Sequence, residues 1–101
     1  MPRPLTISIP HRLTPDEVRA RLQKGLADFR VHPAAKNITI ADEWQGDQLN
    51  LRTTVMSQTV TGRVQINPTT VDVSIDLPWM FAMFAGKIRH EVEQQGTKLL
   101  E

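Results

Sequence analysis

Apolar and polar residues alternate near the start of the chain. Leu5, Ile7 and Ile9 occupy every second position of "LTISI", and Pro10 follows, which cannot donate a hydrogen bond to a β ladder. This pattern predicts a strand over residues 5–9 with one apolar face.

A helix signal follows this strand. Thr14 fits an N-cap, Pro15 the first helical position, and Glu17 the capping-box acid that binds back to the cap. Beyond them, apolar residues recur at helical spacing and predict a single stripe facing the core: Val18, Leu22, Leu26 and Phe29. We expect this helix to end by Arg30.

From Asn37 to Leu77 the hydrophobic period is two, and "QGD", "SQT" and "NPTT" divide the region into four strands. Short connections between neighbouring strands favour an antiparallel meander. A helical pattern closes the chain, so the order is β-α-β-β-β-β-α. This order predicts an α+β fold, a two-layer sandwich in which a mostly antiparallel five-stranded sheet carries two helices on one face.

The start of the last helix, "LPWMFAMFAG", is more apolar than one buried face requires. At 100° per residue, Trp79 and Met83 project almost opposite the expected core face, and Met80 lies on the flank. The expected core residues are Phe81, Phe84, Ala85, Ile88, Val92 and Leu99. We therefore predict that Trp79, Met80 and Met83 form an exposed apolar patch, which usually marks an interaction site.

Two other interpretations of this segment stay open. "LPW" can be a turn that folds Trp79 over the sheet edge as a lid on the core, with the helix beginning near Phe81, or the helix assignment itself can be wrong. A ligand cavity between the layers is a further option. Five strands make a sheet about 20 Å wide, which two helices cover, so we expect little space between the layers. Such a cavity requires one helix to lift away and is disfavoured.

The composition is that of one ordinary domain over residues 1–101, with 40% hydrophobic and 23% charged residues. The net charge is +1 and the basic residues are dispersed, which argues against nucleic acid as a partner. There is no cysteine, and no segment resembles a signal peptide or a membrane span. We expect a soluble, cytoplasmic protein.

The residues that could carry chemistry are scattered. His11, His32 and His90 do not share metal-ligand spacing, and "HEVE" at 90–93 is not a zinc-peptidase motif. We expect no catalytic residue, metal or cofactor, and we lean against an enzyme, which would need one of these histidines to meet a carboxylate in a cleft. A secondary binding site at His11, Trp44 and Asp47 stays open, although Trp44 is expected to be a packing anchor.

Several motifs together carry a resemblance to a known family. They are "ISIPHRLTPDEVRARL", "WQGDQLNLRTTV", "TGRVQI" and "VSIDLPWMFAMFAGKIRHEVEQQGTKLL". Over residues 7–100 the chain resembles the polyhydroxyalkanoic acid system family, also called the polyhydroxyalkanoate granule-region proteins. This resemblance implies a bacterial protein encoded near genes of polyester storage, and it implies no particular activity.

Two functions fit these observations. The first is a non-enzymatic binding or structural protein of the polyester storage system, which uses the apolar patch to meet a granule surface, a granule protein or a second copy in a homodimer. It would then lie in the cytoplasm, at storage granules. The alternative is a carrier that holds a small apolar or hydroxyacyl ligand between helix and sheet.

Overall fold

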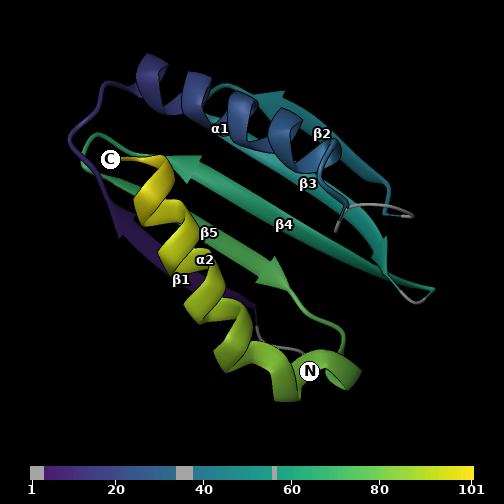
Figure 1. Ribbon diagram of the computed structural model, residues 1–101. Coiled ribbons are helices and arrows are strands. Elements are labelled where there is room, and N and C mark those ends of the chain that lie inside the picture. The colour runs from purple at the N-terminus through teal and green to yellow at the C-terminus, as the bar shows by residue number, and fades with distance from the viewer. Residues whose placement is uncertain (1–3, 34–37, 56) are drawn as a thin grey trace.

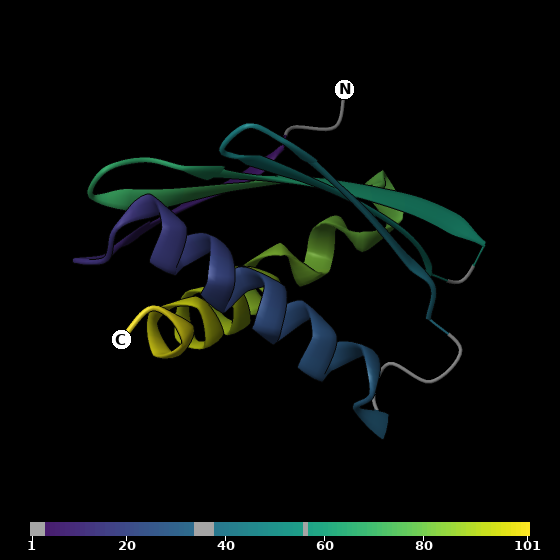
Figure 2. The same cartoon turned by 90° about the horizontal axis from the view of Figure 1, so that it is seen from above.

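The structure, a computed structural model, describes residues 4–33, 38–55 and 57–101. One antiparallel sheet with strand order β1-β5-β4-β3-β2 forms one layer, and the helices cover one of its faces (Figures 1 and 2). The predicted α+β sandwich and its order of elements are confirmed. The elements are β1 (Leu5–Pro10), α1 (Pro15–Arg30), β2 (Ile40–Gln45), β3 (Gln48–Val55), β4 (Gln58–Ile66), β5 (Thr70–Asp76), the 3₁₀ helix η2 (Trp79–Phe84) and α2 (Ala85–Leu99).

The core lies between the helices and the inner face of the sheet. Burial alternates along β1 as its sequence predicts, and β3, β4 and β5 add further buried residues to the same face. Val18 from α1 and Leu100, which follows α2, complete this core. Its sheet residues are Leu5, Ile7, Ile9, Leu49, Val64, Ile66 and Val71.

The turn between β2 and β3 depends on a glycine. Gln45 pairs with Gln48, so Gly46 and Asp47 form a two-residue hairpin loop. Gly46 has a φ of 61°, a value that side chains disfavour and that a type II′ hairpin turn requires at its first central position. Asn37, where the alternating pattern was expected to begin, lies outside the described residues, and β2 begins at Ile40.

The start of α1 is the predicted capping box. The Glu17 backbone N–H donates to the Thr14 hydroxyl, and the Thr14 backbone N–H donates to the Glu17 carboxylate, each over 3.2 Å. The latter bond holds the pKa of Glu17 below its ordinary value of 4.5, with smaller contributions from the Thr14 side chain and the charge of Arg21. The folded protein therefore favours the ionised form of Glu17.

This lowered pKa makes part of the stability depend on pH. The stabilisation is fully present above pH 4.5, and it is lost as the pH falls through the lower pKa of the folded state. Glu17→Gln keeps a capping side chain but cannot ionise. Urea unfolding between pH 7 and pH 3 should show wild-type stability falling more steeply than that of Glu17→Gln below about pH 4.5. Equal slopes for the two proteins would contradict this assignment.

Both outer strands of the sheet receive an arginine from a helix. Arg89 of α2 donates to the Thr6 carbonyl of β1 over 2.9 Å. Arg30, at the end of α1, donates to the Ile40 carbonyl of β2 over 2.8 Å and forms an ion pair of 2.5 Å with Asp42. These guanidinium groups occupy backbone acceptors that a further strand would otherwise use.

Two glycines set where α2 packs. At Gly96, a Cβ atom would overlap the Cδ1 atom of Ile9, so this face of α2 lies directly on β1. At Gly25, a Cβ atom would stand 3.2 Å from a methyl group of Leu99, which marks the place where α1 and α2 meet. Arg21 strengthens this junction, because it donates to the carbonyls of Leu99 and Glu101.

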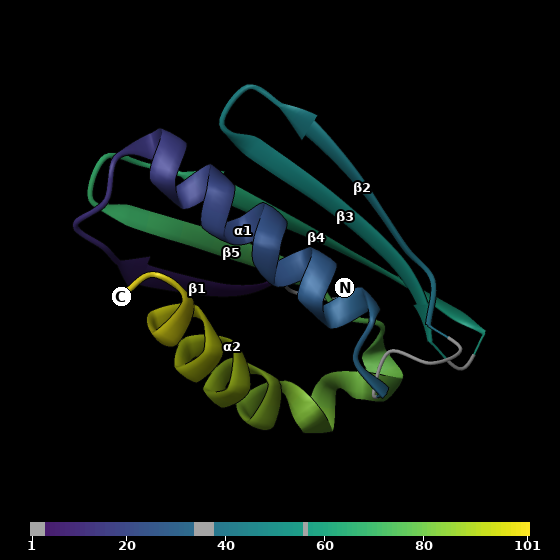
Figure 3. The same cartoon turned by 45° about the horizontal axis from the view of Figure 1, so that its top comes forward.

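From its first turns, α1 moves away from the sheet along its length (Figures 2 and 3). Burial along its predicted apolar stripe decreases accordingly: Val18 is fully buried, Leu22 and Leu26 are half-buried, and Phe29 is 40% exposed. The expectation that the whole stripe faces the core is wrong at Phe29. The helix makes its closest contact with the sheet near its N-terminus and lifts away thereafter.

Candidate functional site

The segment Trp79–Phe84 is a 3₁₀ helix, which leads into α2 at Ala85 (Figure 1). In a 3₁₀ helix, residues i and i+3 stand one above the other. Met80 therefore aligns with Met83, and Phe81 with Phe84. None of the six side chains is buried, and four large apolar ones are exposed, which we call the η2 patch: Trp79, Met80, Met83 and Phe84.

The geometry decides between the interpretations of this segment. Trp79 is 81% exposed and Met83 is 82% exposed, so a tryptophan lid over the core is excluded. The assignment of Phe84 to the core is wrong, because this side chain is 48% exposed. The projection assumed an α-helix that packs on the sheet, whereas this segment is a 3₁₀ helix in which no side chain is buried. That Trp79, Met80 and Met83 bind a partner stays a prediction.

A groove of about 760 Å³ separates α1 and α2 above the sheet. Its walls are mostly apolar and include Leu22, Phe29, Leu51, Val73, Val92 and Leu99. It exists because α1 lifts away from the sheet, the very condition that a cavity between the layers requires. The expectation that the two helices leave little room between the layers is therefore wrong.

Polar side chains border the groove as well. His32, which follows α1, and Glu91 and Gln95 of α2 belong to its lining and are exposed. An enzyme would need a histidine to meet a carboxylate in a cleft, and His32 and Glu91 line the same groove. His11 and His90 are not part of this lining.

His11 joins two loops at one end of the sheet. It is 7% exposed; its Nε2 lies 2.9 Å from the Asn67 carbonyl oxygen, and its Nδ1 accepts from the Leu13 N–H over 3.1 Å. Because Nδ1 accepts, the ring proton belongs on Nε2, which donates to Asn67. Nε2 thus ties the loop before α1 to the turn between β4 and β5, and Nδ1 fixes the backbone of the loop before α1 itself.

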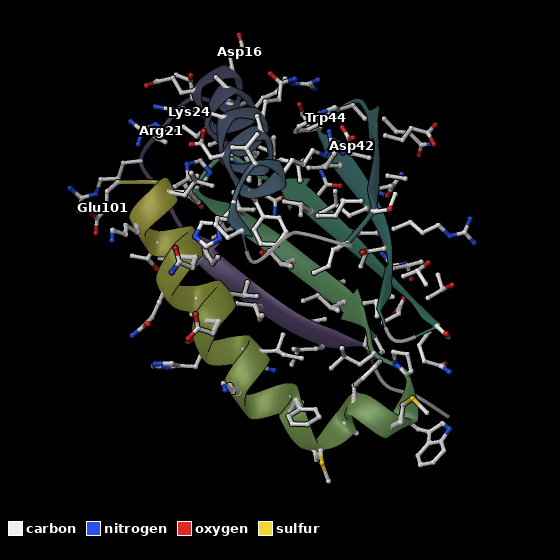
Figure 4. All side chains as sticks on the ribbon, turned by 45° about the vertical axis from the view of Figure 1, so that its right-hand side comes forward. Asp16, Arg21, Lys24, Asp42, Trp44 and Glu101 are labelled. Atoms are coloured by element: carbon white, nitrogen blue, oxygen red, sulfur yellow. The ribbon has the colours of Figure 1, made fainter. Side chains whose placement is uncertain are left out.

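Trp44 and Asp47 contact Arg19 of α1. The Arg19 guanidinium lies 4.4 Å from the centre of the indole ring and 3.7 Å from the Asp47 carboxylate, and it also donates to the Gly46 carbonyl. Figure 4 shows Trp44 on the side of β2 that faces α1. Trp44 is therefore the packing anchor that its position predicts, and ligand binding at His11, Trp44 and Asp47 stays a prediction.

The described residues contain neither a cluster of metal-ligating side chains nor a helix that could cross a membrane. Across residues 4–33, 38–55 and 57–101, no three His, Asp or Glu side chains gather in a group that could hold a metal ion. Within the same ranges, no helix has the length and apolar character needed to cross a membrane.

Comparison with known families gives the protein its setting. The model of the family described as "Putative polyhydroxyalkanoic acid system protein" matches residues 5–100, nearly the whole chain. The chain belongs to this family. Its membership confirms the resemblance found in the sequence motifs. No curated protein and no solved structure was found to match the chain.

The groove was not predicted from the sequence, because Val92 and Leu99 were expected in a closed core, whereas both line the groove. A signal was nevertheless present in Gly25 and Gly96, which line the groove at its narrow part. Small residues allow close approach at one point, and two straight helices that touch at one point must diverge elsewhere. The direction of that divergence is not encoded in a hydrophobic pattern.

Proposed function

We propose that the protein attaches to the apolar surface of polyester granules through the η2 patch and does so without catalysis. The observation that carries this proposal is the exposure of four large apolar side chains within six consecutive residues. Family membership supplies the polyester setting. Methionine suits an irregular polymer surface because its thioether side chain is flexible and polarisable, and tryptophan adds a large contact area.

The size of the patch favours a surface over an obligate dimer. Three of its four members, Trp79, Met80 and Met83, offer roughly 200–300 Å² of apolar area, equivalent to about 5–7 kcal/mol before the costs of association. A specific protein–protein interface buries about 800 Å² on each partner. One patch is too small for that, whereas weak adsorption to a polymer needs no complementary shape.

Self-association through the sheet is also disfavoured. Arg30 and Arg89 donate to backbone carbonyls of the two outer strands, β2 and β1, so a second copy does not find these acceptors free. The η2 patch thus stays the better surface for contact, and a second copy there is an alternative outcome of the experiment below.

The test is a double substitution, Trp79→Gln with Met83→Lys. It should weaken co-sedimentation with protein-free poly(3-hydroxybutyrate) particles by about tenfold or more, because it replaces the two most exposed members of the patch with polar groups. Binding of the wild type should persist in 0.5 M salt, since salt screens charge attraction but does not weaken apolar contact.

The matched control is Val31→Lys. Val31 is 84% exposed, much like the two substituted residues, but it lies at the C-cap of α1 and outside the η2 patch. This variant should bind the particles as the wild type does. Oligomer size is measured on the same samples by light scattering. Unchanged particle binding in the double variant would refute the proposal, and so would a smaller oligomer with unchanged binding, which would assign the patch to a contact between copies.

A further inference from the structure

The groove between α1 and α2 has the dimensions of a small-molecule site. Its volume of about 760 Å³ falls within the range of roughly 300–1,000 Å³ that such sites occupy. Ile9 and Val71, both buried, line it together with half-buried side chains of β3 and β5. None of the η2 patch residues belongs to the lining, so the groove is separate from the proposed docking surface.

The shape of the groove favours a thin, flexible occupant. Gly25 and Leu99 bring α1 and α2 together and narrow the space there, while the C-terminal part of α1 rises from the sheet (Figure 2). A helix from another protein is about 10–12 Å wide with its side chains, too wide for a space that narrows to a helix contact. A single hydrocarbon chain can follow the apolar walls into the narrow part.

The polar residues at the border of the groove indicate the chemistry of the ligand's polar head group. Glu91 and Gln95 stand one turn apart on α2, so they share one helix face, and no Lys or Arg is found among the described lining residues. An anionic head would therefore be repelled by the Glu91 carboxylate, and among the described lining residues only the imidazole of His32 could offset that charge. A hydroxyl group would instead donate to that carboxylate, and the Gln95 amide can donate to a carbonyl oxygen.

We propose that the groove binds one aliphatic acyl chain with an uncharged, hydroxyl-bearing head, of the kind found in esters of medium-chain 3-hydroxy acids. The chain lies against Leu51, Val73 and Val92, the hydroxyl group donates to Glu91, and the ester carbonyl accepts from Gln95. Binding in the groove does not require docking through η2.

The first experiment titrates the full chain with methyl 3-hydroxydecanoate and follows the methyl NMR signals of its valine and leucine residues. Signals of groove residues such as Val73 and Val92 should shift on binding. Methyl decanoate, which lacks the hydroxyl group, should bind about tenfold more weakly. From the hydroxyhexanoate to the hydroxydecanoate ester, each added CH₂ group should strengthen binding by up to about fourfold.

Two variants place the ligand in the groove. Glu91→Lys should reverse the preference for the head, so that decanoate anion binds more tightly than the hydroxy ester, whereas Glu93→Lys is the matched control because Glu93 is exposed on α2 outside this lining. Val92→Trp should fill the groove and abolish binding. If Val92→Trp does not fold, the comparison of Glu91→Lys with Glu93→Lys still shows whether the ligand head lies at Glu91.

Several outcomes would overturn the inference. The first is that the groove signals do not shift even at the solubility limit of the ester. The second is that wild type and Glu91→Lys show the same relative affinity for the ester and the decanoate anion. The third is that a folded Val92→Trp variant binds the ester as tightly as the wild type does. If the groove signals shift with protein concentration but do not change when the ester is added, the groove binds a second copy of the chain instead. The two proposals fail separately, because Trp79→Gln with Met83→Lys should still bind the ester, and Val92→Trp should still bind polyester particles.

Discussion

Replacing His11 with alanine is expected to lower the free energy of unfolding by about 2–5 kcal/mol. The substitution removes the acceptor of the Leu13 N–H and the donor to the Asn67 carbonyl, which lie 3.1 and 2.9 Å from the ring nitrogens. His11 itself is 7% exposed, so water can replace these bonds only in part. Each buried group left without a partner costs about 1–3 kcal/mol, and the lost ring leaves a gap.

Urea denaturation at pH 7 measures this loss. His90→Ala is the control, because His90 is an exposed residue of α2, and its effect should stay within about 0.5 kcal/mol. The backbone N–H of His11 still donates to the Thr69 carbonyl in the alanine variant, so the strand end should stay in place. An effect of His11→Ala as small as that of His90→Ala would show that the ring does not hold the two loops together.

Gly96→Val is expected to destabilise the fold by about 2–3 kcal/mol, because it forces atoms into a packed contact. A Cβ atom at this position already overlaps the Cδ1 atom of Ile9. With alanine, rotation about the Cβ–Cγ1 bond of Ile9 can move Cδ1 away and relieve the overlap. The two further methyl groups of valine instead press α2 away from β1. Helix propensity opposes this loss only weakly, since valine is slightly better than glycine inside a helix.

Gly86 offers a matched control on the same helix. A Cβ atom at Gly86 would meet no atom within 4 Å, so Gly86→Val has the same change in propensity without the contact. The difference between the two variants in urea unfolding therefore isolates the packing at Gly96. Equal stability of the two variants would show that α2 is free to shift on the sheet.

The sequence predicts most of the architecture because its local signals agree with one another. The alternation of Leu5, Ile7 and Ile9 gives the buried face of β1, and Thr14 with Glu17 gives the start of α1. "QGD" predicts the β2–β3 turn because Gly46 supplies the positive φ. Each of these signals acts within a few residues, where backbone geometry and hydrogen bonding decide the outcome.

The candidate sites are less well predicted because they depend on how elements meet. Phe84 was misassigned because "WMFAMF" has the apolar content of a buried helix, whereas the segment forms a 3₁₀ helix with no buried side chain. Phe29 continues a helical stripe by its spacing, yet its exposure follows from the tilt of α1. That tilt results from distant contacts, such as Arg21 with Leu99, and has no local pattern.

The arginines at the two sheet edges also affect how copies behave when they are crowded together. Any protein that collects on a particle reaches a high local concentration, where open strand edges act as templates for fibrils. Here Arg89 donates to a carbonyl at the edge of β1, and Arg30, paired with Asp42, donates to a carbonyl at the edge of β2; charged groups at a strand edge disfavour a dry stack of strands. Dense coverage of a particle should therefore leave each molecule folded as a separate unit.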